Sequence, residues 1–236
     1  MSEKIIHTML RSISPERIQH EGEIVVIGLG RFGSALAHTL IEMGYEVLGI
    51  DFDEQIVQDH SEALTHVVQA DTTSPKALKQ VGAADAVTVV VCIGTGIEAS
   101  VLTVTALVDL GVKNIWAKAI TRAHGKILQR VGAHQVVYPE AEMGKRVAHI
   151  VTGDMIEYVA LDDDFVMVEM AAPPELSGVP LGESGLRDKY KVTVVCVKKP
   201  GRPFTYADRE TVLSAHDLIV VAGHREHVDR FAQSER

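Results

Sequence analysis

The chain has 236 residues, of which 46% are hydrophobic and 23% charged, and its formal net charge is −9 at pH 7. This balance is typical of a globular chain long enough to bury one large core or two small ones. The acidic charge argues against general nucleic-acid binding. The sequence offers neither a run of roughly 18 apolar residues nor the pattern of a signal peptide, so any work at a membrane is expected to go through a partner.

Several residue types that often carry chemistry are present without a reactive pattern. Cys92 and Cys196 lie in separate apolar runs, which indicates reduced thiols in a cytosolic protein rather than a disulfide framework. The N-terminal residues 4–11 are expected to belong to an arm that is flexible or bound to a partner. The 11 histidines are scattered without zinc-ligand spacing, so structural or solvated roles are expected for His38, His124, His149 and His224.

One stretch near the N-terminus has the pattern of a nucleotide-binding turn. Glu23–Ile27 is a β-branched apolar run, and residues 28–33 read Gly-Leu-Gly-Arg-Phe-Gly. A helical pattern follows over Ser34–Met43, and Val47–Ile50 predicts a second strand that ends at Asp51. Glycines at this spacing inside a β-α-β unit, with an acid about 20 residues further on, form a dinucleotide-binding fingerprint.

Each residue of this fingerprint has an expected physical role. Gly28 permits a tight turn, Gly30 permits close approach of a pyrophosphate, and Gly33 lets the helix pack on the strand. Asp51 can accept hydrogen bonds from ribose hydroxyls and would repel a 2′-phosphate, which favours NAD or an adenine nucleotide over NADP. Arg31 at the helix start can meet phosphate charge. The alternative is a packing turn that binds nothing.

The rest of the first half alternates strands with helices, which predicts a parallel, doubly wound, Rossmann-like sheet with right-handed crossovers. Polar or glycine residues follow the strand ends, where such sheets bind ligands. Strands are expected at His66–Ala70, Ala86–Ile93, Asn114–Lys118 and Gln135–Tyr138, and helices at 54–60, 75–81, 97–110, 122–131 and 141–151.

The pattern changes near residue 152. Short strand-like runs punctuated by proline and glycine follow, with helices expected at 183–189 and 226–232, which predicts a small α+β domain. The expected organisation is a nucleotide-binding domain over residues 22–152 and a smaller domain over residues 153–236. Strands are expected at Ile156–Leu161, Val166–Met170, Val192–Val197 and Leu218–Val221.

With both halves in view, the chain resembles the regulatory subunits of Ktr/Trk potassium-uptake systems, which pair an N-terminal RCK domain with a smaller C-terminal RCK domain. The resemblance covers about residues 22–233 and is closest to the Ktr type, whose subunits carry one such pair. It rests on motifs in register: Val26–Gly33, the strand ending at Asp51, Ala70-Asp71-Thr72, Asn114–Ala119, Tyr138-Pro139-Glu140 with Met143-Gly144, and Ala222-Gly223-His224.

The resemblance implies a regulatory role without catalysis. The N-terminal domain would bind ATP or ADP, and in some members NAD(H). Dimers would assemble into an octameric ring on the cytoplasmic side, beneath a membrane-embedded potassium-translocating subunit, and exchange of ATP for ADP would gate uptake. Some members also bind cyclic di-AMP between C-terminal domains, and Arg187 occupies a position similar to the arginine used there.

The resemblance also implies site residues. The turn would hold the phosphates and Asp51 the ribose, with Arg31 meeting the terminal phosphate. Glu140 would sit near the phosphates and help to hold a cation, Mg²⁺ or Na⁺, because a carboxylate beside a triphosphate would otherwise be repelled. The full expected set comprises Gly28, Leu29, Gly30, Arg31, Phe32, Gly33, Asp51, Asp71, Thr72, Cys92, Ile93, Gly94, Lys118 and Glu140.

Taken residue by residue, simpler interpretations stay open. Lys118 could equally be a solvated lysine at a strand end, and Glu140 could be an acid favoured by the dipole of a helix start. Cys92 is expected to be a small buried hydrophobic residue that lends backbone to the pocket. Residues 162–164, three aspartates, lack the remainder of a calcium loop, and a solvated turn is favoured.

Two other functions remain open at this point. An NAD-dependent oxidoreductase would need an acid/base pair facing a substrate, and none is evident after Met155. A stand-alone redox or nucleotide sensor would differ from the preferred interpretation only in its partner.

Overall fold

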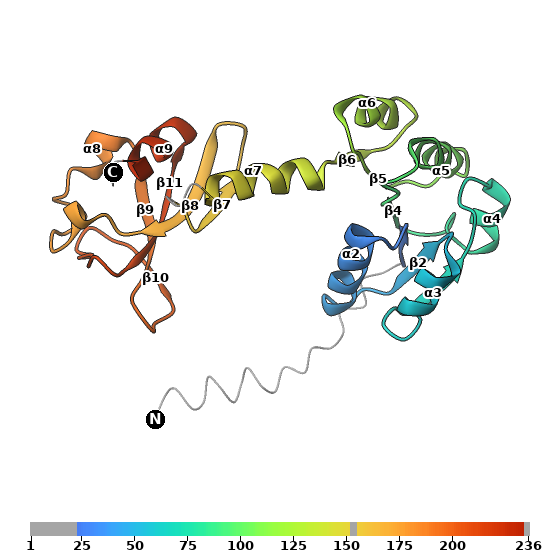
Figure 1. Ribbon diagram of the computed structural model, residues 1–236, viewed down its shortest axis with the longest axis horizontal. Coiled ribbons are helices and arrows are strands. Elements are labelled where there is room, and N and C mark those ends of the chain that lie inside the picture. The colour runs from blue at the N-terminus through green and yellow to red at the C-terminus, as the bar shows by residue number, and fades with distance from the viewer. Residues whose placement is uncertain (1–22, 152–154, 234–236) are drawn as a thin grey trace. The chain divides into compact units, whose positions relative to one another are not determined.

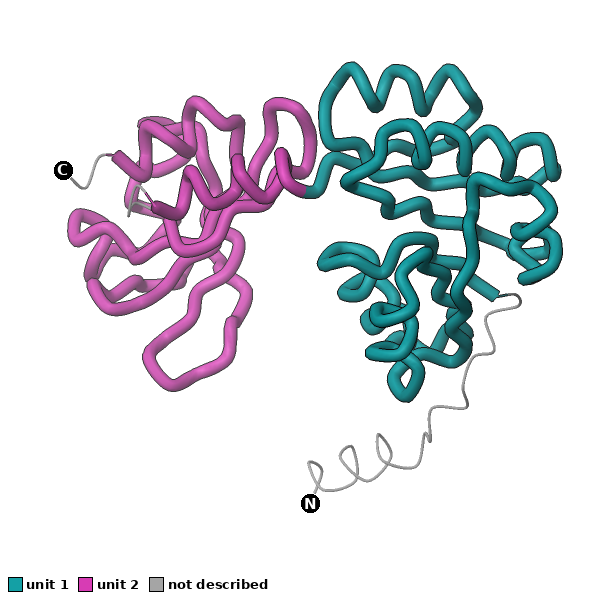
Figure 2. Tube along the Cα trace, turned by 45° about the vertical axis from the view of Figure 1, so that its right-hand side comes forward, with its two compact units in different colours: residues 1–139 teal, residues 140–236 magenta. Residues whose placement is uncertain are grey.

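The computed structural model describes residues 23–151 and 155–233. The chain divides into two compact units, residues 1–139 and 140–236 (Figure 2), which are described separately as unit 1 and unit 2. The expected domain boundary at 152/153 and the expected N-terminal arm both lie outside the described residues. Among the described residues, the helices are too short or too polar to cross a membrane.

Unit 1 is built on a six-stranded sheet in the order β3-β2-β1-β4-β5-β6, and every pairing is parallel (Figure 1). The chain therefore starts in the middle of the sheet, builds outward to β3, and then crosses back to β4. This confirms the predicted doubly wound sheet. The strands are β1 Ile24–Ile27, β2 Val47–Asp51, β3 His66–Gln69, β4 Thr88–Val91, β5 Ile115–Lys118 and β6 Gln135–Val137.

Helices connect these strands, and separate apolar clusters form the core. Leu107, Ile115 and Leu128 lie in one fully buried cluster, and Val26 and Ala37 lie in another, where α2 packs against the sheet. The central strands β1 and β4 consist mostly of buried β-branched residues, as expected of parallel strands covered on both faces. The helices are α2 Arg31–Glu42, α3 Glu54–His60, α4 Pro75–Gln80, α5 Ile97–Asp109 and α6 Arg122–Arg130.

Two element bounds in unit 1 differ from the sequence prediction. Helix α2 begins at Arg31, three residues before the expected start, because Gly30 already has the extended backbone of an N-cap. Strand β4 begins at Thr88 rather than Ala86, and Val87 is 53% exposed. The apolar run alone could not mark where pairing with β1 starts.

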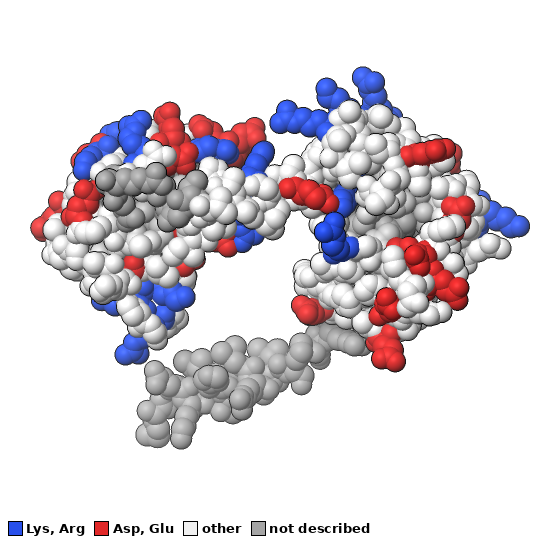
Figure 3. Space-filling view, in the orientation of Figure 1, with Lys and Arg blue, Asp and Glu red and all other residues white. Residues whose placement is uncertain are grey.

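Charged side chains are unevenly distributed over unit 1. In Figure 3, Lys and Arg side chains gather over α6, whereas Asp and Glu side chains gather over the part of the unit that contains α3. These regions belong to opposite edges of the sheet, because α6 precedes edge strand β6 and α3 precedes edge strand β3.

Unit 2 contains a five-stranded antiparallel sheet in the order β10-β9-β11-β8-β7. Its core includes Met170, Ile219 and Phe231, and confirms the small α+β fold. The elements are α7 Pro139–Val151, β7 Glu157–Ala160, β8 Phe165–Ala171, the 3₁₀ helix η1 Pro174–Leu176, α8 Leu186–Tyr190, β9 Thr193–Lys198, β10 Phe204–Tyr206, β11 Leu218–His224 and α9 Arg225–Gln233.

The sequence predicted most of unit 2 but misplaced one helix and missed one strand. The helix expected from residue 183 starts at Leu186, because Gly185 takes a left-handed conformation with φ of 66° just before it. Strand β10 was not predicted. Its three residues are all exposed at the sheet edge, so they lack the alternation of apolar and polar residues that marks a half-buried strand.

Helix α7 is attached to the sheet of unit 2 by side chains on its later turns. The guanidinium of Arg146 forms an ion pair with Glu157 at the start of β7, and its Nε donates to Oε1 of that carboxylate at 2.6 Å. The ring of His149 stacks on Tyr158, with ring centroids 4.0 Å apart. The pKa of Glu157 is lowered because the arginine donates to its charged form.

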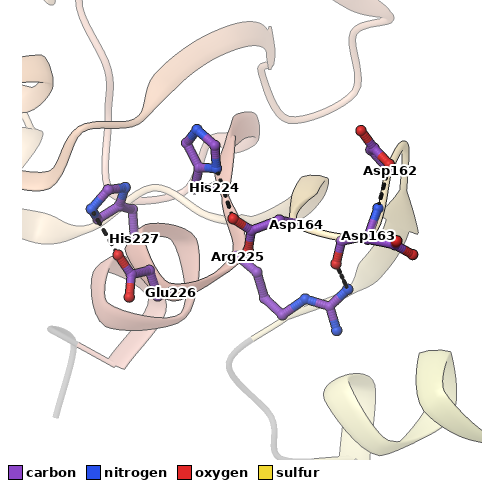
Figure 4. A network of polar contacts seen from close by, with 7 residues as sticks. All are labelled: Asp162, Asp163, Asp164, His224, Arg225, Glu226 and His227. Carbon is purple, nitrogen blue, oxygen red and sulfur yellow. Dashed lines mark hydrogen bonds and ion pairs between the residues drawn. The ribbon is translucent and has the colours of Figure 1, made fainter.

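A polar network joins the β7–β8 turn to the start of α9 (Figure 4). The Asp164 carboxylate lies 3.1 Å from Nδ1 of His224, and the Arg225 guanidinium donates to the Asp163 carbonyl at 2.8 Å. Residues 162–164 are exposed, as expected of a solvated turn. The described residues contain no group of three His, Cys, Asp or Glu side chains suited to a metal ion.

Candidate nucleotide-binding site

The turn between β1 and α2 has the backbone of an anion-binding site. Gly28 has φ of +89°, which only glycine adopts readily. Helix α2 begins with Gly30 as its N-cap, no side chain of the described residues caps its first N–H groups, and its first turn carries no acid. Free N–H groups and the positive end of the helix dipole therefore face outward from the turn.

Close packing explains two of the three glycines. A Cβ on Gly33 would lie 1.9 Å from the carbonyl oxygen of Gly28, so any side chain there would push the helix off the turn. A Cβ on Gly28 would lie 3.2 Å from the backbone of Cys92 and Ile93, which follow β4. Gly30 faces open space. Its expected role, close approach of a phosphate, stays a prediction.

Asp51 at the end of β2 holds the turn in place. Its Oδ2 accepts a hydrogen bond from the Leu29 N–H at 2.6 Å, and its Oδ1 accepts from the Asp53 N–H at 3.0 Å. Each carboxylate oxygen has capacity for a second hydrogen bond, so a ribose contact is compatible with this arrangement. The sequence pattern indicated the ribose role and missed the structural one.

Residues after β3 are tied to their surroundings by side-chain hydrogen bonds. Thr72 is buried and its hydroxyl lies 3.0 Å from the hydroxyl of Thr103 on α5. Asp71 is exposed, and its Oδ1 accepts from the backbone and the hydroxyl of Thr73. Both belong to the expected set of site residues, and the resemblance implies that they wall the adenosine pocket, which stays a prediction. Thr103 was not expected, although a threonine on the buried face of an apolar helix is a usable signal.

Lys118 is brought to the glycine turn by the fold. The side chain is only 8% exposed, which excludes the alternative of a solvated lysine at a strand end. Its Nζ lies 5.7 Å from the centroid of the Phe32 ring in α2. A Cβ on Gly94, just after β4, would lie 3.3 Å from the same nitrogen. Three segments that are distant in sequence therefore place a cationic side chain beside the start of α2.

Cys92 behaves as the sequence indicated. It is buried, and burial raises the pKa of its thiol to about 12 despite the nearby charge of Lys118. Its backbone N–H donates to the carbonyl of Ile27 at 2.7 Å, so Cys92 continues the pairing of β4 with β1. The thiol is an inert packing group, not a nucleophile.

Arg31 and Glu140 are both exposed. Arg31 is the first residue of α2, and its expected contact with the terminal phosphate stays a prediction. Glu140 lies in the first turn of α7 and belongs to unit 2. Its expected approach to phosphates and to a cation stays a prediction.

His124 shows the structural role that the sequence allowed. The ring is 2% exposed, and burial lowers its pKa. Its Nδ1 accepts from the backbone N–H of Ile120 at 3.4 Å, while its Nε2 has no hydrogen-bond partner among the described residues.

The sheet order reverses between β1 and β4. The glycine turn follows β1, and Asp51 and Lys118 are the last residues of β2 and β5, the strands that flank this central pair. These features define a Rossmann-type nucleotide-binding fold followed by a small antiparallel domain. Family models agree with the two parts: the TrkA-N domain matches residues 24–139 and the TrkA-C domain matches residues 165–234.

Curated relatives identify the family. The chain is 36% identical over 210 residues to the Ktr system potassium uptake protein C of Bacillus subtilis, covering 89% of this chain and 95% of that protein. It is 33% identical to the Ktr system potassium uptake protein A of the same organism, again over 210 residues that cover 89% of this chain and 95% of that protein. The chain belongs to the family of Ktr regulatory subunits, which are regulators of potassium uptake and not enzymes.

Solved structures confirm the fold. The RCK domain of GsuK superposes with a TM-score of 0.63 at 20% identity, covering 90% of this chain and 47% of that chain. A GsuK channel bound to NAD gives a TM-score of 0.59 at 19% identity, covering 95% of this chain and 43% of that chain. This chain thus spans about half the length of those solved chains.

Proposed function

We propose that this chain is a nucleotide-sensing regulatory subunit that binds ATP and ADP in unit 1 and thereby gates a membrane-embedded potassium-translocating subunit. The observation that carries the proposal is the uncapped start of α2, held by Asp51 and flanked by the buried Lys118. Backbone N–H groups and a lysine ammonium are donors that suit phosphate oxygens. The family membership supports the potassium-transport context.

Residues of the glycine turn fit the phosphates of a nucleotide. Arg31 would supply charge-assisted hydrogen bonds to the terminal phosphate, so its interaction energy would differ between ATP and ADP. A switch requires such a difference, because a ligand shifts an equilibrium only by its differential affinity for the two states. Glu140 would contribute to Mg²⁺ or Na⁺ binding with phosphate oxygens completing the coordination.

Assembly and localisation follow from the same proposal. The chain would form homodimers that join into an octameric ring at the cytoplasmic face of the membrane, held there by the translocating subunit. Cyclic di-AMP would bind at unit 2. Arg187 is exposed on α8, where a phosphate can reach it.

The test is calorimetric titration of the full chain, stripped of nucleotide, with ATP, ADP, NADH and NAD⁺, each with and without Mg²⁺. We expect tight binding of ATP and ADP, with ATP favoured by the cation. Negligible ATP binding with tight NADH binding would overturn the ATP/ADP assignment and favour a redox sensor, a possibility that the NAD-bound GsuK structure makes worth measuring. Absence of binding by all four would reduce the turn to a packing feature.

A further inference from the structure

Unit 1 carries opposite charges at the two edges of its sheet. Residues 110–139, which contain β5, α6 and β6, include five Lys or Arg and no Asp or Glu. Residues 32–75, which contain β2, α3 and β3, include eight Asp or Glu and no Lys or Arg. Because β6 and β3 are the two edge strands, the β6 edge is positive within a chain whose net charge is −9.

Helix α6 presents the positive charge in a row. Arg122, Lys126 and Arg130 are spaced four residues apart, so they lie on one face of the helix, and all three are exposed. None of them forms an ion pair with a residue that the structure describes. Like charges at this spacing destabilise a helix. The row therefore gains nothing from its own helix and is suited to an anionic surface outside the unit.

Helix α6 also exposes an apolar side chain that flanks this row. Ile127 is 43% exposed, whereas His124, Gly125 and Leu128 are buried against the rest of unit 1. A helix that shows solvent a row of cations with an apolar residue beside it has the surface chemistry of interfacial helices, which combine attraction to anionic lipids with a small apolar contact.

We propose that the α6 face, defined by Arg122, Lys126, Ile127 and Arg130, docks on an anionic phospholipid surface. Charge complementarity favours this occupant, because a lipid surface is a diffuse negative layer that a row of flexible cations meets without a matching pocket. The acidic edge around α3 would be repelled by the same surface, so the field of the domain also orients it. This inference goes beyond nucleotide gating and does not depend on it.

The test compares binding of the full chain to vesicles of phosphatidylcholine alone and of phosphatidylcholine with about 30% phosphatidylglycerol, by co-sedimentation. The variant Arg122→Gln/Lys126→Gln/Arg130→Gln removes the row. The control Lys76→Gln/Lys79→Gln/Lys199→Gln removes three exposed lysines elsewhere; each triple variant changes the net charge from −9 to −12. Each basic side chain near an anionic surface contributes roughly fivefold to partitioning onto the vesicles. We therefore expect the first variant to partition onto phosphatidylglycerol vesicles about a hundredfold more weakly than the wild type.

A second variant guards against misfolding. Lys126→Glu places an acid between two arginines at four-residue spacing, which favours the helix, yet it removes two units of positive charge and should lower partitioning about 25-fold. Salt at about 300 mM should weaken wild-type binding, because exposed charges are screened. The proposal is overturned if the wild type ignores phosphatidylglycerol, if both α6 variants bind like the wild type, or if the control triple loses as much as the α6 triple. The first of these results would assign the row to an acidic protein surface instead.

Discussion

At the scale of single residues, Arg31 is the side chain that would distinguish ATP from ADP under the proposed function. It is exposed at the first position of α2, and a hydrogen bond to a charged group contributes about 1.5–3 kcal/mol. Arg31→Ala should therefore lower the affinity for ATP by roughly ten- to a hundredfold and the affinity for ADP much less, as measured by calorimetric titration. Lys76→Ala, an exposed lysine on α4, is the matched control. Equal losses for both nucleotides would mean that Arg31 does not contact the terminal phosphate.

Asp51 requires two substitutions, because it holds the glycine turn and, in the proposed function, would also contact the ribose. Asp51→Asn keeps an oxygen that can accept from the Leu29 N–H, so the fold should be retained. Loss of the charge-assisted ribose contact should lower the affinities for ATP and ADP alike by about tenfold. Asp51→Ala leaves that N–H without its acceptor and should also lower the free energy of unfolding by about 1–3 kcal/mol. Titration and chemical denaturation measure the two effects. Undiminished nucleotide affinity in the asparagine variant would remove Asp51 from the site.

The two cysteines should differ sharply in reactivity. Burial raises the pKa of the Cys92 thiol to about 12, so at pH 8 only about one molecule in ten thousand carries the reactive thiolate. Cys196 is partly exposed on β9. Alkylation of the native chain at pH 8 should therefore modify Cys196 and spare Cys92, and mass spectrometry of peptides would show this. Cys196→Ser is the control that should leave the native chain unmodified, and rapid labelling of Cys92 would contradict its burial.

Sequence reasoning reached most of the candidate site but not its contacts. The glycine spacing and the acid at the end of β2 are local signals, and they led directly to Gly28 and Asp51. Lys118 could not be distinguished from a solvated lysine, because its burial depends on Phe32 and Gly94, which only the sheet order brings beside it. The bond from Leu29 to Asp51 was missed for the same reason.

At the scale of elements, apolar runs located the strands of unit 1, including the partly exposed edge strand β3. Strands β1, β2 and β5 were placed within a residue or two, because mostly buried apolar residues form uninterrupted runs. Strand β10 was missed because an exposed edge strand has no such pattern. It is set instead by the turn that includes Gly201, whose φ is +69°, and by the pairing of Phe204 with Lys198.

Helix α7 offers a test of how an element is held. Arg146 and Glu157 join it to β7, and the lowered pKa of Glu157 keeps this carboxyl ionised well below neutral pH. Glu157→Gln should accelerate amide hydrogen exchange in α7, because a neutral amide replaces the ionic partner of Arg146 while the stacking of His149 on Tyr158 remains. Glu142→Gln, an exposed acid on the same helix, is the control. Unchanged exchange in α7 would show that the stacking alone holds it.

At the scale of the whole molecule, nucleotide binding should raise the stability of one unit only, unit 1. The expected site residues other than Glu140 lie in unit 1, and the core of unit 2 is separate. A ligand that binds only the folded state stabilises it by about 2.7 kcal/mol at a concentration one hundred times its Kd. Saturating ADP should therefore slow amide exchange in β1, β2 and β4 and leave β8 and β11 unchanged, measured by hydrogen exchange with mass spectrometry.

The comparison of ADP with ATP then shows whether the signal leaves unit 1. If the two nucleotides protect the central strands equally but differ in the exchange of α7, the difference in phosphate charge has been passed to the helix that joins unit 2, as a gating device requires. Identical exchange in α7 with both nucleotides would contradict gating through this helix. Asp51→Asn at matched nucleotide concentration is the control, because its weaker binding should reduce protection by both nucleotides in proportion to lost occupancy.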